Sequence, residues 1–259
     1  MSRSGVLAPG EPVLLIDRKK RRYLIDLADG GAFHSHSGVL SHDDMIGSAE
    51  GTTFRSTKGM VFTALRPTIT DFILKMPRGA QVIYPKDIGP ILILADIFPG
   101  CRVLESGLGS GALSTGMLRA GAEILGYEIR EDFLEKAREN VGRFLGDEPL
   151  GRYDTHLRDV YEGIEAEELD RVVLDLPEPW RVVAHAEEAL RSGGIFLAYT
   201  PSIIQASQLH DRLEESKFGF AETVEILQRG WHVQGVAVRP DHRMVAHTGF
   251  LTHARLLEE

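Results

Sequence analysis

Disulfide bonds are excluded within this chain, because its 259 residues include a single cysteine, Cys101. No apolar run approaches the ~20 residues that a membrane-spanning helix requires. Residues Met1–Gly10 lack the long apolar stretch of a secretory signal peptide. We therefore expect a cytoplasmic protein with no membrane partner.

Basic residues are too few to balance the acidic ones: the chain has 29 lysines and arginines and 38 aspartates and glutamates, which gives a net charge of -9. This balance argues mildly against a nucleic-acid partner, because polyanions attract basic proteins. The charge is unevenly distributed: residues 1–80 carry 11 basic and 8 acidic side chains, and the remainder carries 18 and 30. The basic excess is concentrated in Arg18–Arg22. This run is either the solvated tip of a hairpin or a patch that contacts phosphate groups.

Short apolar runs separated by turn residues fill the first part of the chain. Val13–Ile16 and Tyr23–Leu27 flank the basic run and predict a β-hairpin, and Asp29–Gly31 is a turn signal. No strong helical periodicity occurs before Thr68. We therefore predict a small β-rich domain over residues 1–76, folded as a compact barrel or sandwich.

From residue 77 onward, strand and helix patterns alternate, which indicates an α/β fold with a parallel sheet and helices on both faces. The predicted strands are Arg102–Glu105, Ile124–Glu128, Val172–Leu176 and Ile195–Tyr199, with a weaker one at Leu157–Asp159. The apolar face of a helix is formed by Phe133, Ala137, Val141 and Phe144. Two further β-rich runs, Thr223–Val238 and His247–Leu256, suggest an antiparallel pair that closes this Rossmann-like sheet.

A glycine-rich loop, Glu105–Gly111 (ESGLGSG), follows the first of these strands and precedes a helical stretch, Ala112–Arg119. Its glycines allow a tight turn and let a ligand approach the bare backbone. Glu128, at the end of the next strand, can accept both ribose hydroxyls of an adenosine. The loop also satisfies the dinucleotide pattern G-x-G-x-x-A, so NAD and S-adenosylmethionine both fit at this step.

Three features favour S-adenosylmethionine over NAD. The carboxylate of Glu105 could meet the ammonium of a methionine moiety, but it would face a pyrophosphate unfavourably. Asp159, at the end of the third strand, could bind an adenine amino group. The antiparallel end of the sheet differs from the second half of a dinucleotide-binding fold. A glycine turn without any ligand is the third interpretation.

Asp175 is the catalytic candidate, because it ends an apolar strand and precedes a rigid loop with two prolines, Leu176–Trp180. A carboxylate beside the cofactor can accept a hydrogen bond from an exocyclic amino group. It can also stabilise the cation formed when adenine N1 attacks a methyl sulfonium. Tyr84 could stack on a flipped base, and Lys86 and Asp87 could position cofactor or RNA. The alternatives are a strand-capping aspartate and a linker with a buried tyrosine.

We predict no metal site, because the ten histidines form no ligand pattern and the pair His34 and His36 has no evident third partner. Trp231 and His232 either line the base pocket or pack at a sheet edge. From the residues alone, several functions remain open. They are a methyltransferase for nucleic acid or a small molecule, an NAD-dependent oxidoreductase, and a non-catalytic RNA-binding protein.

Taken together, these motifs closely resemble the bacterial tRNA (adenine-58-N1) methyltransferases, most of all the actinobacterial members. The resemblance covers nearly the whole chain. The motifs on which it rests are Phe33–His36, Tyr84–Asp87, Glu105–Gly111, Asp175–Trp180, Gln228–Trp231 and His247–Leu251. Family loops usually read E-A-G-x-G-S-G, so Ser106 departs from the alanine of this pattern, and Leu108, at its variable position, replaces a smaller or more polar residue and adds bulk beside the cofactor.

The resemblance implies a class I methyltransferase domain over residues 77–259 that uses S-adenosylmethionine. It implies a homotetramer, a dimer of dimers, that methylates N1 of adenine 58 in the T-loop of tRNA, and in some members adenine 57. Asp175 takes the catalytic, adenine-orienting role, and Tyr84 lies at the cofactor and base pocket. The implied cofactor contacts are Glu105, Gly107, Leu108, Gly109, Ser110, Gly111, Glu128, Asp159 and Asp175.

Overall fold

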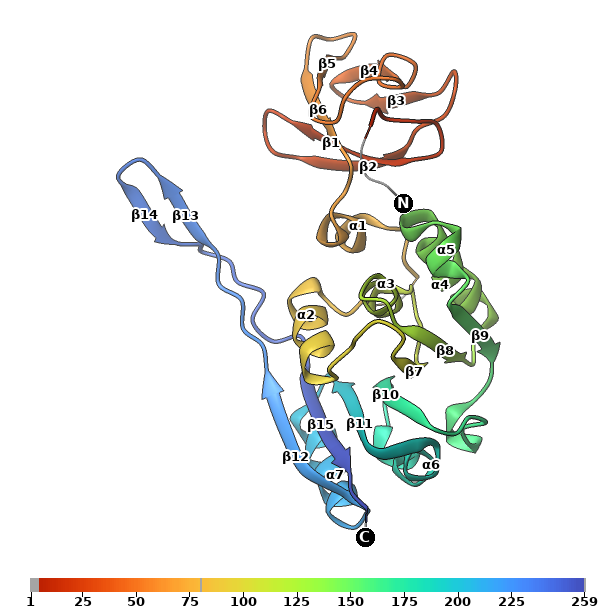
Figure 1. Cartoon of the computed structure of the whole chain (residues 1–259). Coiled ribbons are helices and arrows are strands. Elements are labelled where there is room, and N and C mark those ends of the chain that lie inside the picture. The colour runs from red at the N-terminus through yellow and green to blue at the C-terminus, as the bar shows by residue number, and fades with distance from the viewer. Residues whose placement is uncertain (1–4, 80, 259) are drawn as a thin grey trace. The chain divides into compact units, whose positions relative to one another are not determined.

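The structure is a computed structural model that describes residues 5–79 and 81–258. The chain divides into two compact units, whose elements are labelled in Figure 1. The first unit comprises Met1–Pro77 and Arg143–Gly146, and the second comprises Arg78–Gly142 and Asp147–Glu259. Among the described residues, no helix combines the length and the apolar character needed to cross a bilayer.

The first unit consists mainly of short antiparallel strands, as the sequence predicts for this β-rich region. Its sheet has the order β2-β1-β6-β5. The strands are β1 (Pro12–Asp17), β2 (Arg22–Asp26), β5 (Thr53–Arg55) and β6 (Val61–Leu65), beside the hairpin of β3 (Ala32–Ser35) and β4 (Gly38–Ser41). Leu15 and Phe62 point into a common core. Helix α1 (Ile69–Lys75) then starts at Thr68, which forms a capping box with Asp71.

The second unit is built on a mostly parallel sheet, called here the large sheet, with the order β12-β15-β11-β10-β7-β8-β9. Its parallel strands are β7 (Arg102–Ser106), β8 (Glu123–Glu128), β9 (Tyr153–Leu157), β10 (Leu169–Asp175) and β11 (Leu190–Thr200). The antiparallel edge is formed by β15 (Phe250–Leu256) and β12 (Phe218–Glu225). The predicted Rossmann-like fold with an antiparallel end is confirmed. The weak strand predicted at Leu157–Asp159 lies earlier, in β9.

Helices lie on both faces of the large sheet. On β10, Val172 packs into the core shared with α6 (Val183–Ala189) and α7 (Ile203–Glu214). The side chain of Arg171 points to the other face and donates to the carbonyl of Ala95, at the end of α2 (Pro85–Leu94). Helix α3 (Ala112–Arg119) packs beside α2. The remaining helical elements are α4 (Glu131–Leu145), α5 (Asp147–Leu150), η1 (Val160–Glu162) and η2 (Pro179–Val182).

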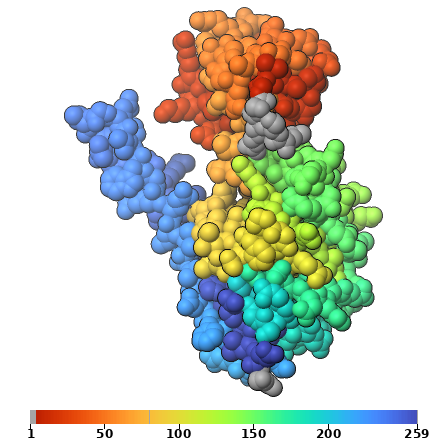
Figure 2. Space-filling model, viewed as in Figure 1, coloured from red at the N-terminus to blue at the C-terminus, as the bar shows by residue number. Residues whose placement is uncertain are grey.

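Between β12 and β15 the chain leaves the large sheet as an arm, defined here as residues 227–247. The arm ends in a hairpin of β13 (Trp231–Gln234) and β14 (Ala237–Pro240), which projects from the body of the second unit (Figures 1 and 2). The expectation of a single β-rich run over Thr223–Val238 is therefore wrong in part, because β12 ends at Glu225. Packing of Trp231 at a sheet edge is also wrong, since its side chain is 58% exposed on the arm.

Candidate active site

The glycine-rich loop joins β7 to α3 at the carboxyl edge of the large sheet. Gly107 has a φ of 88°, and a Cβ at this position would collide with the backbone carbonyl of Asp175. Gly111 has a φ of 77°, and its Cβ would lie 2.9 Å from the carbonyl oxygen of Ala137. Both positions favour glycine, because the left-handed region strains residues that carry a Cβ. The first contact brings the loop against the end of β10.

Parallel pairing brings three carboxyl groups to one face of this edge. Glu105 on β7 pairs in register with Val173 on β10 and with Gly126 on β8. Side chains alternate along a strand, so Asp175 and Glu128, each two residues further on, lie on the same face as Glu105. The structure therefore gathers three of the residues that the sequence singled out.

Glu105 is the most enclosed of the three carboxyl groups, with 1% of its surface exposed. Its Oε2 atom has no hydrogen-bond partner among the described residues. Burial is the main cause that raises the pKa of Glu105 to about 8; hydrogen bonds from Ser114 act against this rise, and the charges of Asp175 and Glu128 add to it. A buried acceptor without a partner is costly, so this position suits a cationic or hydrogen-bond-donating ligand.

Backbone amides hold the carboxylate of Glu128. Its Oε1 atom accepts the N–H groups of Ile129 and Arg130 at 2.9 and 3.1 Å, and its Oε2 atom accepts the N–H of Gly109 at 3.2 Å. These bonds tie the end of β8 to the glycine-rich loop. Asp159 follows β9 and caps the N-terminus of η1. Both acidic residues thus lie at the edge of the sheet where the sequence predicts adenosine contacts.

Asp175 ends β10, and its carboxylate accepts no hydrogen bond from the residues that the structure describes. Burial is the main cause that raises the pKa of Asp175 to about 7. Other groups fix the loop that follows: Gln205 Nε2 donates to the Pro177 carbonyl at 2.8 Å, and the Glu178 N–H donates to the Tyr161 hydroxyl at 3.2 Å. Asp175 is therefore held through its backbone, while its carboxylate oxygens stay available to a ligand.

Leu108 and Ser110 complete the loop. Leu108 is buried, and its methyl groups pack over β8, where a Cβ on Gly126 would lie 3.1 Å from them. The Ser110 carbonyl accepts a 3.0 Å hydrogen bond from Asn140, whereas its buried hydroxyl has no partner among the described residues. The loop, residues 81–83 and Asp175 line a narrow crevice. The methyl groups of Leu108 are therefore accommodated against β8, although the residue still lines the crevice.

The Tyr84–Asp87 motif starts helix α2. Tyr84 is the N-cap, and Pro85 is the first helical residue, where a missing N–H removes no helical hydrogen bond. Lys86 and Asp87 are buried and form an ion pair of 2.7 Å. Lys86 Nζ also donates to the carbonyl of Ile226 at 2.6 Å. These two side chains therefore bind other parts of the chain, at the point where the arm begins.

Thr248, the residue that follows the arm, contacts the same ion pair. Thr248 Oγ1 donates to the carboxylate of Asp87 at 2.7 Å, and the Tyr199 hydroxyl donates to the Thr248 carbonyl at 2.5 Å. Burial is the main cause that raises the pKa of Tyr199 to about 12. Tyr199 pairs in register with Asp175, so this network reaches the catalytic candidate. Sequence reasoning assigned no role to Tyr199 or to Thr248, although the motif at His247–Leu251 pointed to this region.

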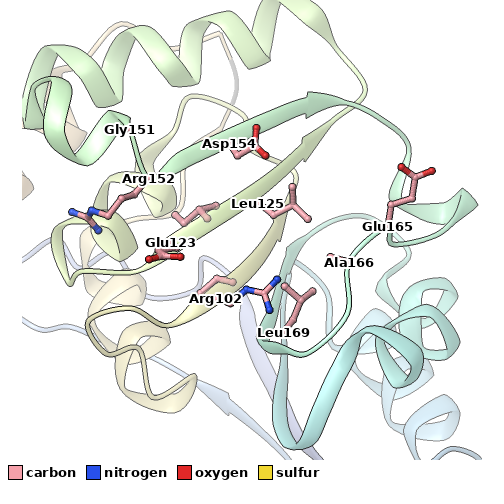
Figure 3. A pocket seen from close by; sticks show the side chains of 11 residues that line it. Arg102, Glu123, Leu125, Gly151, Arg152, Asp154, Glu165, Ala166 and Leu169 are labelled. Carbon is pink, nitrogen blue, oxygen red and sulfur yellow. The ribbon is translucent and has the colours of Figure 1, made fainter.

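A larger groove, of about 580 Å³, lies at a different edge of the second unit. Figure 3 shows it between the first residues of β7, β8 and β9 and the segment that precedes β10. Arg102 and Glu123 mark the amino ends of β7 and β8. Ligands of doubly wound sheets bind outside the carboxyl ends of the strands. This groove is therefore not the cofactor site.

The residues at the carboxyl edge fit S-adenosylmethionine. The buried Glu105 carboxyl with its unused Oε2 suits an ammonium group, and it would repel a pyrophosphate. The glycine positions leave the backbone bare, and Glu128 offers an anchored carboxylate for ribose hydroxyls. Fold and site together define a methyltransferase of the class that takes an S-adenosylmethionine-type cofactor.

Comparisons with known proteins narrow this class. Residues 59–239 match the family described as tRNA methyltransferase complex GCD14 subunit, and residues 5–54 match the TrmI-like N-terminal family. The tRNA (adenine(58)-N(1))-methyltransferase TrmI of Thermus thermophilus is 37% identical over 251 residues, which cover 95% of this chain and 97% of the relative. The tRNA (adenine(57)-N(1)/adenine(58)-N(1))-methyltransferase TrmI of Methanocaldococcus jannaschii is 34% identical over an alignment that covers 95% of this chain and 95% of the relative.

Two solved structures of methyltransferases share the fold of this chain over nearly its whole length. A SAM-dependent O-methyltransferase from Thermotoga maritima superposes with a TM-score of 0.93 at 31% identity, covering 98% of this chain and 96% of that one. The tRNA (m1A58) methyltransferase TrmI from Aquifex aeolicus gives a TM-score of 0.86 at 29% identity, covering 98% and 100%. The chain therefore belongs to the GCD14/TrmI family of tRNA methyltransferases. This membership argues against the NAD-dependent oxidoreductase that the glycine pattern alone left open.

Proposed function

We propose that this protein methylates N1 of adenine 58 in the T-loop of tRNA, with S-adenosylmethionine as the methyl donor. The observation that carries the proposal is the carboxylate of Asp175. It lies beside the glycine-rich loop at the carboxyl edge of the large sheet and accepts no hydrogen bond from the described residues. Relatives that are 37% and 34% identical are named for this reaction.

The cofactor supplies a methyl group that its sulfonium makes electrophilic. Ionised Glu105 holds the ammonium of the methionine moiety, because the two opposite charges compensate each other in a buried place. The backbone of Gly107–Gly111 lines the cofactor. Glu128 accepts hydrogen bonds from the ribose hydroxyls, and Asp159 accepts one from the adenine amino group.

Asp175 then orients the target base. Its carboxylate accepts a hydrogen bond from the exocyclic amino group, which places the adjacent ring nitrogen N1 toward the methyl group. N1 would attack the methyl carbon with its own lone pair while the bond from that carbon to sulfur breaks and the neutral thioether S-adenosylhomocysteine leaves, so the methyl transfer needs no general base. The adenine becomes cationic, and ionised Asp175 stabilises the developing charge. Tyr84 stacks on the base after it has been flipped out.

Nucleoside analysis of tRNA tests this proposal. Wild-type protein, S-adenosylmethionine and an unmodified tRNA transcript should yield 1-methyladenosine, and a transcript with guanosine at position 58 should yield none. Asp175→Asn should lower kcat by roughly 10²–10³-fold. The matched control Glu178→Gln changes a carboxylate of the same loop that pairs with Arg181, and it should retain activity. Full activity of Asp175→Asn, or methylation at another nucleotide, would contradict the proposal.

We further propose that the protein works in the cytoplasm as a homotetramer arranged as a dimer of dimers. The exposed apolar side chains of the arm support this assembly, because a soluble monomer rarely leaves such a surface uncovered. They include Trp231, Val233, Val236 and Val238. Multi-angle light scattering of the purified protein gives the mass directly. A monomeric mass at micromolar concentration would argue against the tetramer.

A further inference from the structure

Three turns of the first unit meet at one end of its sheet. Register pairs Asp17, at the end of β1, with Phe62, at the start of β6, so the turn after β1 lies beside the turn before β6. The turn between β3 and β4 joins them: Arg21 Nη1 lies 2.8 Å from His36 Nε2, and Lys58 Nζ donates to the His36 carbonyl at 3.3 Å. We call this surface the basic end, defined by Arg18, Lys19, Lys20, Arg21 and Lys58.

The turn that carries the basic run has a fixed backbone. Asp17 is 4% exposed, and its Oδ1 atom accepts the N–H groups of Lys19 and Arg21 at 2.8 and 3.0 Å. Lys20 adopts a φ of 60°, as the last residue of such a three-residue hairpin loop often does. Arg21 pairs with Asp17 at 2.6 Å. Arg18 and the two lysines are exposed, and they form no ion pair within residues 5–79 and 81–258.

Acidic residues gather at the opposite end of the same sheet. Register pairs Asp26 with Pro12, the first residue of β1, and Asp43 accepts the N–H of Gly30 at 2.8 Å. Asp29 belongs to the same turn as Gly30, and the exposed Asp44 follows Asp43 in the chain. The six residues of β1 separate the two ends by roughly 17–20 Å at the usual rise per residue. This exceeds the Debye length of ~8 Å at physiological ionic strength, so the acidic end does not neutralise the basic end.

We propose that the basic end binds phosphate groups of the RNA backbone and so contributes part of the affinity for tRNA. This inference rests on the proposed function, in which the substrate is tRNA. Residues 81–258 are acidic overall, so attraction to a polyanion must come from local basic surfaces. A membrane surface fits less well, because membrane-binding elements add apolar side chains to basic ones. In the described part of the first unit, the large exposed apolar residues are Val6 and Leu74, and both lie outside the basic end.

The test measures tRNA binding by the full-length protein as a function of salt concentration. The variant Arg18→Gln/Lys19→Gln/Lys20→Asn removes three charges, and asparagine tolerates the left-handed backbone at position 20. If each side chain neutralises one phosphate, the slope of log K against log salt should fall by about 2–3. Between 50 and 200 mM salt, the loss of tRNA affinity should therefore be about 15- to 60-fold smaller for the variant than for the wild type. KM for tRNA should rise, whereas kcat and the Kd for S-adenosylmethionine should not change.

Two matched variants separate local contacts from a change in net charge. Arg18→Lys/Lys19→Arg keeps the charge and should keep the slope. Asp29→Asn/Asp44→Asn alters the charge of the same unit at the acidic end, and the slope should again be unchanged. An unchanged slope in the triple variant would overturn the inference. So would a triple variant that binds phosphatidylserine vesicles less tightly than the wild type does but tRNA equally well.

The same experiment distinguishes this inference from the proposed function. Wild-type protein that forms 1-methyladenosine, together with a triple variant of unchanged slope, would refute only the role of the basic end. A triple variant that shows the predicted slope change, together with wild-type protein that binds tRNA but forms no 1-methyladenosine, would refute only the proposed reaction.

Discussion

Replacing Glu105 with glutamine should remove most of the pH dependence of S-adenosylmethionine binding. In the cofactor-free protein this carboxyl is buried, its Oε2 has no partner among the described residues, and its pKa is raised to about 8. At pH 7 roughly nine-tenths of the molecules therefore carry a proton on Glu105. A cationic ammonium favours the ionised form, so the proton must leave when the cofactor binds.

The magnitude follows from the two raised pKa values. At pH 7, Glu105 should release about 0.9 proton, and Asp175, with a pKa of about 7, should release about 0.5. Below pH 7 the Glu105 contribution lowers the affinity about tenfold per pH unit. In Glu105→Gln only the smaller release from Asp175 should remain.

Isothermal titration calorimetry in two buffers with different ionisation enthalpies counts these protons. The control Glu162→Gln changes an exposed carboxylate on η1 and should release as many protons as the wild type. If Glu105→Gln released the same number of protons as the wild type at pH 7, the buried carboxyl would not be the titrating group. The assignment of Glu105 to the ammonium would then fail.

The same raised pKa affects the stability of the cofactor-free protein. The folded state binds the Glu105 proton more tightly than the unfolded state, whose pKa is near 4.5. The resulting penalty is absent below about pH 4.5, grows as the pH rises toward 8, and is complete above that value. Its full size is about 5 kcal/mol. Glu105→Gln should therefore raise the free energy of unfolding at pH 8–9 and leave it unchanged near pH 4.5, as urea denaturation would show.

Three further substitutions test the construction of the site. Gly107→Ala should lower the free energy of unfolding by roughly 2–3 kcal/mol and should also lower activity, because the new Cβ meets the end of β10. Gly109→Ala has open surroundings and should lower the free energy of unfolding by only about 1 kcal/mol. In urea denaturation, Asp87→Asn should cost about 3–5 kcal/mol, because it leaves the buried Lys86 ammonium without its counter-charge. Trp231→Asp should reduce the mass measured by light scattering without changing the thermal unfolding of the protomer, since Trp231 is exposed there.

Controls and contrary results are specific for each substitution. For the buried pair the control is Glu139→Gln, which breaks an exposed pair with Lys136 and should cost at most about 1 kcal/mol. Equal costs for the two carboxylate variants would contradict the burial argument. Equal costs for the two glycine variants would show that no collision with β10 occurs. A Trp231→Asp variant of unchanged mass would remove the arm from the assembly interface.

Local sequence was sufficient to predict the framework of the site. The strand, glycine-rich loop and helix around Glu105–Gly111 are encoded within a few residues, because positive φ at Gly107 and Gly111 demands glycine at those places. The meeting of Glu105, Glu128 and Asp175 was also predictable. Parallel strands end at one edge of a sheet, and their side chains alternate with a period of two.

Contacts between distant segments could not be predicted in this way. Lys86 reaches Ile226, 140 residues away, and Asp87 reaches Thr248, 161 residues away. The sequence left open whether these two charged residues face the ligand, because only the folded chain brings Ile226 and Thr248, which flank the arm, to α2. The arm itself was missed for a related reason: its alternation is that of a strand, and nothing local shows that the strand leaves the large sheet at Glu225.

The sequence by itself determined the fold class, the order of the elements and the residues at the carboxyl edge, since all of these depend on local patterns of polarity and glycine. Tertiary structure alone decided which charges lack a partner. It buries the Glu105 carboxyl without a donor for Oε2, and it pairs Arg21 with Asp17 while Arg18 stays exposed without an ion pair in the described chain. The physical reason is that desolvation and pairing depend on every group nearby in space, whatever its distance along the chain.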